Sequence, residues 1–293
     1  MGGWGLSDMP SQQGRRVVIT GANSGLGEQM AIALGAAGAQ VTLACRNVAK
    51  AQRVADWIGP HARVAELDLA DLASVRAFAD GFDGADVLIN NAGVMAIPQA
   101  RTADGFEMQI GTNFLGHFAL TGLVLDRIDD RIVTLSSLMH KRARLDVDDL
   151  NWQQRKYSRW VAYSDSKLAD LVFALDLADR LAKAGSAKAS LAAHPGYAAT
   201  ELQGHTETPF EWVMKLGNLT PIAQSAADGA LPALFAATSP HAANGEYYGP
   251  RSFGEMRGAP APASYRRAAD DPDLRRRLWD KAEELTGVQV TVG

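Results

Sequence analysis

Short runs of consecutive apolar residues alternate along this chain with longer stretches in which apolar residues recur every three or four positions. The runs predict buried β-strands at residues 16–20, 40–44, 63–67, 86–90, 131–136 and 190–194, with a candidate seventh strand at 246–248. The longer stretches predict helices at 28–37, in a segment that ends at residue 58, and at 71–79, 105–125, 162–184, 222–237 and 273–285.

Regular alternation of strands and helices predicts the fold class. Strands that are apolar throughout are typical of a parallel sheet covered by helices on both faces. We therefore predict an α/β protein built on a single Rossmann-type, doubly wound parallel sheet of about seven strands. No internal repeat or low-complexity linker divides the sequence, which favours one domain over residues 1–293.

Within this domain, segments of different character are expected. Residues 1–13 look like a loose tail, and residues 14–250 contain the predicted strands and are expected to form the core of the domain. Residues 198–221 follow strand six at the carboxyl edge of the sheet, where ligands bind in such folds, and are expected to form a substrate loop. The C-terminal part, 251–293, is predicted to be a loop and a helix, with a Pro- and Gly-rich irregular stretch at 249–262.

Composition narrows the function classes. Apolar residues make up 47% of the chain and charged residues 21%, which is ordinary for a globular protein with a sizeable core. A net charge of −4 gives no basic excess for nucleic acid. The single cysteine, Cys45, excludes an intramolecular disulfide, and we interpret it as a small apolar residue at a strand end. No apolar run is long enough for a membrane anchor, and residues 1–10 do not resemble a signal peptide, so we expect a cytoplasmic protein.

A glycine-rich turn joins the first strand to the first helix. Thr20 is followed by Gly21, Gly25 and Gly27. Gly21 allows a tight turn, Gly25 lets a pyrophosphate approach the backbone, and Gly27 allows the helix to pack closely on the strand. The helix N-terminus then faces phosphate. The alternative is a helix-entry turn with incidental glycines, but the strand before it and the helix after it favour dinucleotide binding.

Tyr163 and Lys167 are four residues apart in a predicted helix and therefore lie on one face. An ammonium near a phenol favours the phenolate and lowers the pKa of a tyrosine from about 10. The pair thus predicts a tyrosine that can act as an acid or base near neutral pH.

The glycine turn is followed in order by Asp68 after strand three, Asn90 to Gly93 at the end of strand four, Asn113, Ser137, the Tyr163–Lys167 pair and Pro195-Gly196. This order of motifs resembles the short-chain dehydrogenase/reductase family over about residues 14–250. The resemblance implies that this range is a dinucleotide-binding and catalytic core, with a nicotinamide dinucleotide cofactor and a carbonyl/alcohol reaction. It further implies that the cofactor is held by Gly21, Asn23, Ser24, Gly25, Leu26, Gly27, Asp68, Leu69, Asn91, Ala92, Gly93, Tyr163, Lys167, Pro195, Gly196 and Thr200. Residues 43–47, 131–140 and 245–250 further resemble the retinol-dehydrogenase-like and WW-domain-oxidoreductase-like branch.

The end of the second strand bears on which dinucleotide is used. NAD-specific enzymes of this fold usually place an acid there, whereas NADP requires a cation for its 2′-phosphate. Here the acid is absent and Arg46 stands one residue beyond its place. A guanidinium suits phosphate, so we predict NADP(H), preferred over NAD(H). A surface arginine without this role is the alternative.

The same resemblance assigns catalytic roles. Tyr163 would exchange a proton with the substrate oxygen, Lys167 would lower the pKa of the tyrosine and bind the nicotinamide ribose, and Ser137 would hold the substrate oxygen. Asn113 would position a water in the proton relay through a local helix distortion. Each has a structural alternative: Tyr163 and Lys167 as surface residues, Ser137 as a turn cap, and Asn113 as the partner of a backbone group. No metal ligands are predicted, and His194 is interpreted as strand-end packing.

Two further segments bear on the substrate. Residues 139–160 separate Ser137 from Tyr163 by more than in shorter family members, and predict an insertion that either shapes the substrate mouth or covers the surface. The later loop contains Phe210, Trp212, Val213, Met214 and Leu216, which suggests an apolar lid and an apolar small-molecule substrate. Retinal is only an analogy here. Rival interpretations are a catalytically silent NADP(H)-binding sensor or scaffold, or an epimerase or dehydratase of the same fold. The resemblance also makes a homodimer possible.

Overall fold

The computed structural model describes residues 3–197 and 224–292. Its centre is one eight-stranded sheet with the strand order β3-β2-β1-β4-β5-β6-β7-β8. The strands are β1 (Arg16–Thr20), β2 (Gln40–Cys45), β3 (Ala62–Glu66), β4 (Ala85–Asn90), β5 (Ile128–Leu135), β6 (Ala189–Ala193), β7 (Tyr247–Ser252) and β8 (Arg257–Pro262). Strands β1 to β7 pair in parallel, and β8 pairs antiparallel with β7. The doubly wound parallel fold is therefore confirmed.

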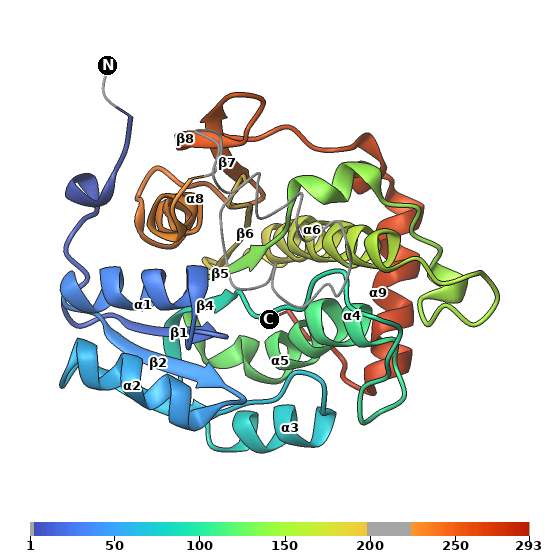
Figure 1. Cartoon of the computed structure of the whole chain (residues 1–293), viewed down its shortest axis with the longest axis horizontal. Helices are drawn as coiled ribbons and strands as arrows, with labels where there is room; N and C mark the ends of the chain where they lie inside the picture. The colour runs from blue at the N-terminus through green and yellow to red at the C-terminus, as the bar shows by residue number, and fades with distance from the viewer. Residues whose placement is uncertain (1–2, 198–223, 293) are drawn as a thin grey trace.

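Helices cover both faces of this sheet (Figure 1). The described helices are α1 (Gly25–Ala36), α2 (Val48–Ile58), α3 (Leu72–Asp80), α4 (Met108–Ile110), α5 (Gly116–Val124), α6 (Arg159–Lys183), α8 (Ala226–Thr238) and α9 (Pro272–Thr286). Short 3-10 helices are η1 (Leu6–Asp8), η3 (Leu125–Arg127), η4 (Leu138–Arg142), η5 (Val147–Asp149) and η7 (Arg267–Asp270), and η2 (Gly111–Leu115) is a π-helix.

Two apolar clusters form the core, one on each face. Helices α1, α2 and α8 pack on one face, and α3, α5, α6 and α9 enclose the other. Strands β1, β2, β4 and β6 are buried along almost their whole length, as expected for a sheet covered on both sides. Between β1 and β4 the strand order reverses, so a crevice opens there at the carboxyl ends of the strands.

The C-terminal part corrects the prediction of an irregular stretch at 249–262. These residues form the second half of β7, a turn and the additional strand β8, so the sheet has eight strands rather than about seven. Pro260 and Pro262 hid this strand in the sequence. Proline cannot donate to the sheet, but β8 is the edge strand, where the missing donor is tolerated.

The N-terminal segment also differs from the loose tail expected. Trp4 lies edge-on against Phe235 of α8, with ring centroids 5.4 Å apart. Gln12 is buried and donates to the Pro10 carbonyl. Trp4 and Gln12 are therefore held by the folded domain, although most of residues 3–13 are exposed. The predicted loop 198–221 lies outside the described residues. Within residues 3–197 and 224–292, no helix has the length and apolarity needed to cross a membrane.

Candidate active site

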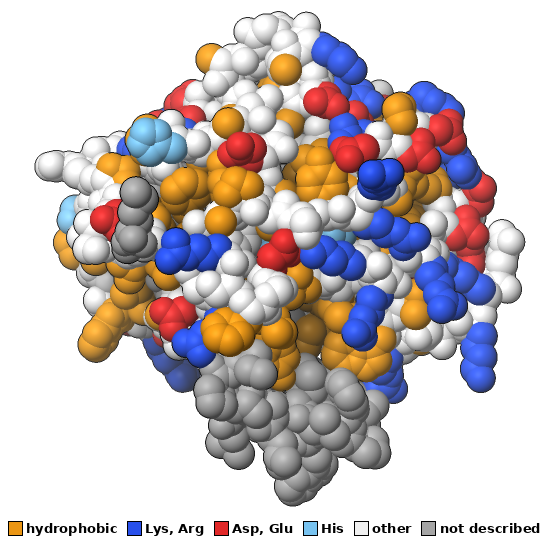
Figure 2. Space-filling model, turned by 90° about the horizontal axis from the view of Figure 1, so that it is seen from above, with side chains coloured by type: hydrophobic (Ala, Val, Ile, Leu, Met, Phe, Trp, Pro, Cys, Tyr) orange, Lys and Arg blue, Asp and Glu red, His pale blue; other side chains and the backbone are white. Residues whose placement is uncertain are grey.

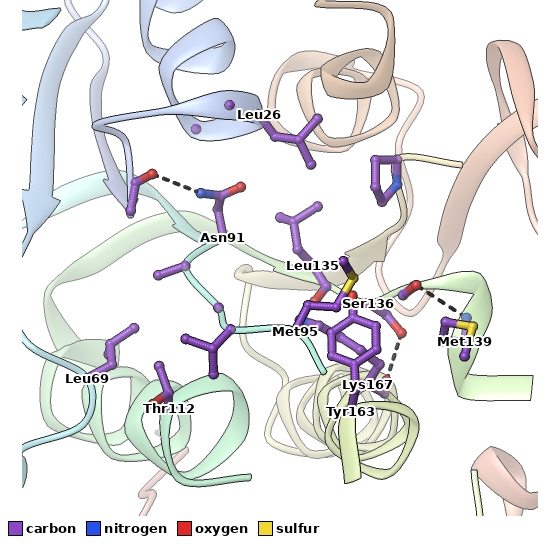
Figure 3. A pocket seen from close by; sticks show the side chains of 18 of the residues that line it. Leu26, Leu69, Asn91, Met95, Thr112, Leu135, Ser136, Met139, Tyr163 and Lys167 are labelled. Carbon is purple, nitrogen blue, oxygen red and sulfur yellow. Dashed lines mark hydrogen bonds between the residues drawn. The ribbon is translucent and has the colours of Figure 1, made fainter. Parts of the chain in front are cut away.

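A cavity of about 1170 Å³ lies at the carboxyl edge of the sheet, at the β1–β4 switch point. Pockets for drug-sized ligands span roughly 300–1,000 Å³, so this cavity has room for a dinucleotide together with a small substrate. Its walls come from the glycine turn, the ends of β2 to β6, helix α6 and the insertion after β5. Figure 3 shows Leu26 on one side of the cavity, with Tyr163 and Lys167 on the other.

The glycine turn is packed too closely against its neighbours to accept a side chain at Gly21 or Gly27. Gly21 has a φ of +66°, and a Cβ there would lie 2.9 Å from the Cα of Ala92. At Gly27 a Cβ would lie 2.4 Å from the Gly21 carbonyl oxygen. Helix α1 begins at Gly25, and the Ser24 side chain does not cap it, so its first N–H groups remain available to phosphate. The glycine turn and the first N–H groups of α1 therefore fit a dinucleotide pyrophosphate.

Thr20 connects this turn to the strand end that follows β4. Its hydroxyl oxygen accepts from the backbone N–H groups of Asn91 and Ala92, each at 2.9 Å. The Asn91 side chain donates to the Thr20 carbonyl at 2.7 Å. The hydroxyl also lies 2.8 Å from Nε2 of His117 on α5. These hydrogen bonds hold the carboxyl ends of β1 and β4 at a fixed separation.

The β2 end of the cavity carries the residue predicted to select the dinucleotide. Arg46 lines the cavity edge with its side chain 74% exposed, and its guanidinium lies 3.7 Å from the Asp68 carboxylate. Asp68 is itself held at the end of β3, where it accepts from the Ala70 N–H. Cys45 is buried, as predicted, and burial raises the pKa of its thiol to about 11, so the thiol is unreactive at neutral pH.

Helix α6 presents Tyr163 and Lys167 to the cavity from one face, as their spacing predicts (Figure 3). The Lys167 ammonium donates to the Leu135 carbonyl at 2.9 Å and to the Asp170 carboxylate at 2.8 Å. Both side chains of this ion pair are buried. Burial alone would lower the pKa of Lys167, but the charges of Asp170 and Tyr163 outweigh it, so the pKa is raised.

The two serines after β5 have different surroundings. Ser136 is buried and donates to the Lys167 carbonyl at 2.7 Å, which ties β5 to α6. Ser137 lines the cavity, and its hydroxyl oxygen accepts from the Met139 N–H at 3.2 Å at the start of η4. Its hydroxyl proton is left free to donate into the cavity. The turn-capping alternative for Ser137 is thus compatible with the catalytic one.

Asn113 sits in the π-helix η2, so the predicted distortion of this helix is present. Its amide is fully engaged: the oxygen accepts from the Val94 N–H at 2.8 Å, and the nitrogen donates to the Val94 carbonyl and to Ser166. Its carbonyl oxygen lies 2.7 Å from Nδ1 of His117. Because a carbonyl only accepts, His117 carries its proton on Nδ1, and its Nε2 accepts from Thr20.

Most of the predicted site residues are brought together by the fold. The following line the cavity: Gly21, Asn23, Ser24, Gly25, Leu26, Gly27, Arg46, Asp68, Leu69, Asn91, Ala92, Gly93, Ser137, Tyr163, Lys167, Pro195 and Gly196. Asn113 lies behind the wall, fully buried, with its side-chain oxygen 3.0 Å from where a Cβ on Gly93 would be. Thr200 lies outside the described residues.

Several residues of this region were missed by sequence reasoning. Asp170 and His117 contact the predicted catalytic residues Lys167 and Asn113 from behind. Asp170 lies three residues after Lys167, and His117 lies four residues after Asn113. On a helix these spacings place side chains next to each other, so both contacts could have been predicted from the sequence. The rest of the cavity wall includes Met95, Met108, Met139, Trp160, Val161 and Met256. These come from separate segments, and only the fold gathers them.

A glycine turn at a helix N-terminus and a tyrosine–lysine pair in one cavity fit the class of nicotinamide-dependent oxidoreductases. A family model described as short chain dehydrogenase matches residues 15–209. The chain belongs to the short-chain dehydrogenase/reductase family, in its retinol-dehydrogenase-like branch. It is an alcohol oxidoreductase that uses a nicotinamide cofactor.

Similar proteins agree with this placement. The chain is 39% identical to human (Homo sapiens) retinol dehydrogenase 13, covering 94% of this chain and 86% of that protein. It is 46% identical to a protein from Mycobacterium Paratuberculosis of known crystal structure, with a TM-score of 0.86 and 99% of both chains covered. It is 25% identical to 3-ketoacyl-(acyl-carrier-protein) reductase from Brucella melitensis complexed with NADH, with a TM-score of 0.65 and 81% and 96% covered.

Proposed function

We propose that this protein interconverts a carbonyl and an alcohol on an apolar small molecule, with NADP(H) as the preferred cofactor and Tyr163 as the acid/base. The observation that carries the proposal is that Tyr163, Lys167 and Ser137 line the same cavity as the glycine turn. Fold alone would not support this reaction, since the same fold hosts others.

Three side chains, Tyr163, Lys167 and Ser137, act in or support the proton transfer that we propose. When bound, the nicotinamide supplies or accepts the hydride. In carbonyl reduction, the Tyr163 hydroxyl donates its proton to the substrate oxygen, and in alcohol oxidation the phenolate takes that proton. Ser137 donates a hydrogen bond to the same oxygen. Lys167 stabilises the phenolate by its charge. Asn113 does not line the cavity. Its side chain holds the backbone of Val94, which does, through two hydrogen bonds.

The NADP(H) preference rests on Arg46. An exposed ion pair such as Arg46–Asp68 is worth little, so the guanidinium can turn to a 2′-phosphate at small cost. Cys45, at the end of β2, offers no carboxylate to the ribose hydroxyls of NAD. Arg46→Ala should reduce kcat/KM for NADPH by about 10–100-fold, the value of a charge-assisted hydrogen bond, and leave NADH nearly unaffected. A wild type that prefers NADH would contradict the assignment.

The apolar substrate is supported by the cavity wall away from the glycine turn. Four methionines, Met95, Met108, Met139 and Met256, line the cavity together with Trp160. Methionine adapts its shape to different apolar partners, so this wall suits several substrates rather than one. The insertion contributes Met139 to it, which favours the mouth-shaping interpretation of residues 139–160. On the face of the molecule seen in Figure 2, apolar side chains gather between charged ones.

The decisive experiment is Tyr163→Phe in an NADPH-consumption screen over apolar aldehydes, ketones and quinones. We expect turnover to fall by about 10²–10⁴-fold while NADPH affinity and the melting temperature stay near the wild-type values. Near-full turnover in the variant would refute the mechanism. A wild type that binds NADPH but turns over no substrate would favour the sensor or scaffold.

The location and assembly remain predictions. We propose a cytoplasmic location on the sequence grounds given above. For a homodimer, the helices implied by the resemblance are those holding Asn113 and Tyr163. In the structure, Trp279 of α9 packs against Phe118 of α5 and Phe173 of α6. A dimer through these helices must therefore include α9, and light scattering of the purified protein tests for it.

A further inference from the structure

Lys167 has a charged neighbour that the proposed chemistry does not use. Asp170 lies one turn further along α6, 1% exposed, with one carboxylate oxygen 2.8 Å from the Lys167 ammonium. Its other carboxylate oxygen is buried without a hydrogen-bond partner among the described residues. Burying a carboxylate with one oxygen lacking a hydrogen bond is energetically unfavourable, so its presence at this position needs a physical reason. Its hydrogen bonding runs to Lys167, so its effect is transmitted through the ammonium.

Burial is unfavourable for both charges. A buried ammonium without a counter-ion tends to lose its proton. Here the charges of Asp170 and Tyr163 overcome that tendency, and the pKa of Lys167 is raised. Burial raises the pKa of Asp170 to about 6 against the opposing attraction of Lys167, so the carboxylate is ionised at neutral pH.

The charges that act on Lys167 are those of Asp170 and Tyr163. Two cations come from η4, which packs on α6: Lys141 pairs with Glu255 at 2.9 Å, and Arg142 lines the cavity. From β5 comes the Leu135 carbonyl, and from α5 comes His117, which burial keeps neutral by lowering its pKa to about 3. On the α9 side, Arg275 pairs with Asp179. Within the described residues, Asp170 is thus the carboxylate that balances the Lys167 charge.

We propose that Asp170 is a positioning residue that keeps Lys167 protonated and directed at Tyr163. The Leu135 carbonyl and the Asp170 carboxylate take two of the three ammonium protons, which leaves the third for the cavity. Without the carboxylate, the lowering of the Lys167 pKa by burial is opposed by less negative charge, so the Tyr163 phenolate is less well supported by its cation. This inference rests on the proposed acid/base role of Tyr163.

The test replaces Asp170 with Asn, which keeps the shape and an acceptor oxygen but removes the charge. The first readout needs neither substrate nor cofactor. It is the pH midpoint of the ultraviolet phenolate signal of Tyr163, obtained by subtracting the matching Tyr163→Phe variant. We expect Asp170→Asn to move this midpoint up by about one unit or more, a tenfold or greater loss of phenolate at a given pH.

The second readout is the pH profile of kcat/KM for alcohol oxidation, whose rising limb should move in the same direction. Asp176→Asn is the matched control, because it removes another carboxylate of α6, which pairs with Arg180 at 3.0 Å. It should leave both midpoints unchanged. In a double-mutant cycle, Asp170→Asn should add no further shift to Lys167→Met, since Asp170 acts through the ammonium.

The outcomes separate the alternatives. A uniform loss of activity with unmoved midpoints, or a midpoint that moves down, overturns the inference and leaves Asp170 a structural residue. If the midpoint moves up but no substrate is turned over by the wild type, the inference stands and the proposed function fails. Should melting curves show Asp170→Asn to be unfolded, Asp170→Ser, which leaves space for a water beside the ammonium, takes its place with the same expected shift.

Discussion

The buried ring of His117 makes a quantitative prediction about acid stability. It is 2% exposed, it bridges Thr20 and Asn113, and burial lowers its pKa to about 3. In the unfolded chain a histidine titrates near 6.5. Between these values the unfolded state binds a proton that the folded state does not, so stability falls as the pH is lowered through this interval and is constant above it.

The magnitude follows from the two pKa values. Lowering the pH from 7.5 to 5.0 should cost about 2 kcal/mol of unfolding free energy through His117 alone. Other groups act in the opposite sense: burial raises the pKa of Asp165 to about 6, so protonation of its carboxyl favours the folded state over the same range. The pH dependence of the unfolding free energy is therefore the sum of several groups. The contribution of His117 is obtained by comparing the wild type with a variant that lacks this histidine.

The assay is urea unfolding of the wild type and His117→Gln at pH 7.5 and 5.0. Glutamine can still hydrogen-bond to Thr20 but cannot be protonated. Whatever its constant cost, the variant should lose about 2 kcal/mol less than the wild type between the two pH values. The exposed His61, changed to Gln, is the control and should behave as the wild type does. Equal losses in wild type and His117→Gln would refute the reasoning.

Two packing predictions concern other parts of the molecule. Gly27→Ala should weaken NADPH binding about tenfold or more, because the new methyl group would lie 2.4 Å from the Gly21 carbonyl oxygen. Gly81→Ala is the control, because its methyl group would lie 3.8 Å from the nearest atom, and it should leave the affinity unchanged. Calorimetry measures both affinities. Trp279→Ala should cost about 3–5 kcal/mol in urea unfolding, whereas Trp57→Ala, at a side chain 79% exposed, should stay within about 0.5 kcal/mol.

The fold was predictable wherever local pattern and tertiary environment agree. Strands buried on both faces have to be apolar throughout, so β1, β2, β4 and β6 were visible as runs. β8 was not, because an edge strand needs neither continuous apolar residues nor every N–H, and Pro260 and Pro262 look like loop residues. The packing of Trp4 on Phe235 was equally hidden, since it depends on where the chain returns after more than 200 residues.

The site divides in the same way. Gly21, Gly27 and the Tyr163–Lys167 pair were predictable, because each depends on spacing within one turn or helix. The bridge from Thr20 to His117 joins residues 97 apart in the chain. Such contacts are set by the order of strands in the sheet, which no short stretch of sequence contains. The sequence therefore predicts the groups that face the cavity better than those that hold them from behind.

This division has a mechanical consequence for the cofactor and the catalytic helix. Thr20 ends the strand that opens the glycine turn, and it contacts His117, whose other nitrogen holds the carbonyl of Asn113 in the π-helix. Asn113 in turn binds Ser166, between Tyr163 and Lys167 on α6. A series of buried hydrogen bonds thus connects the glycine turn to the helix that carries Tyr163 and Lys167. Because the groups along it are buried, a loss at any link leaves polar atoms unsatisfied, and the two halves of the site are expected to be stable only together.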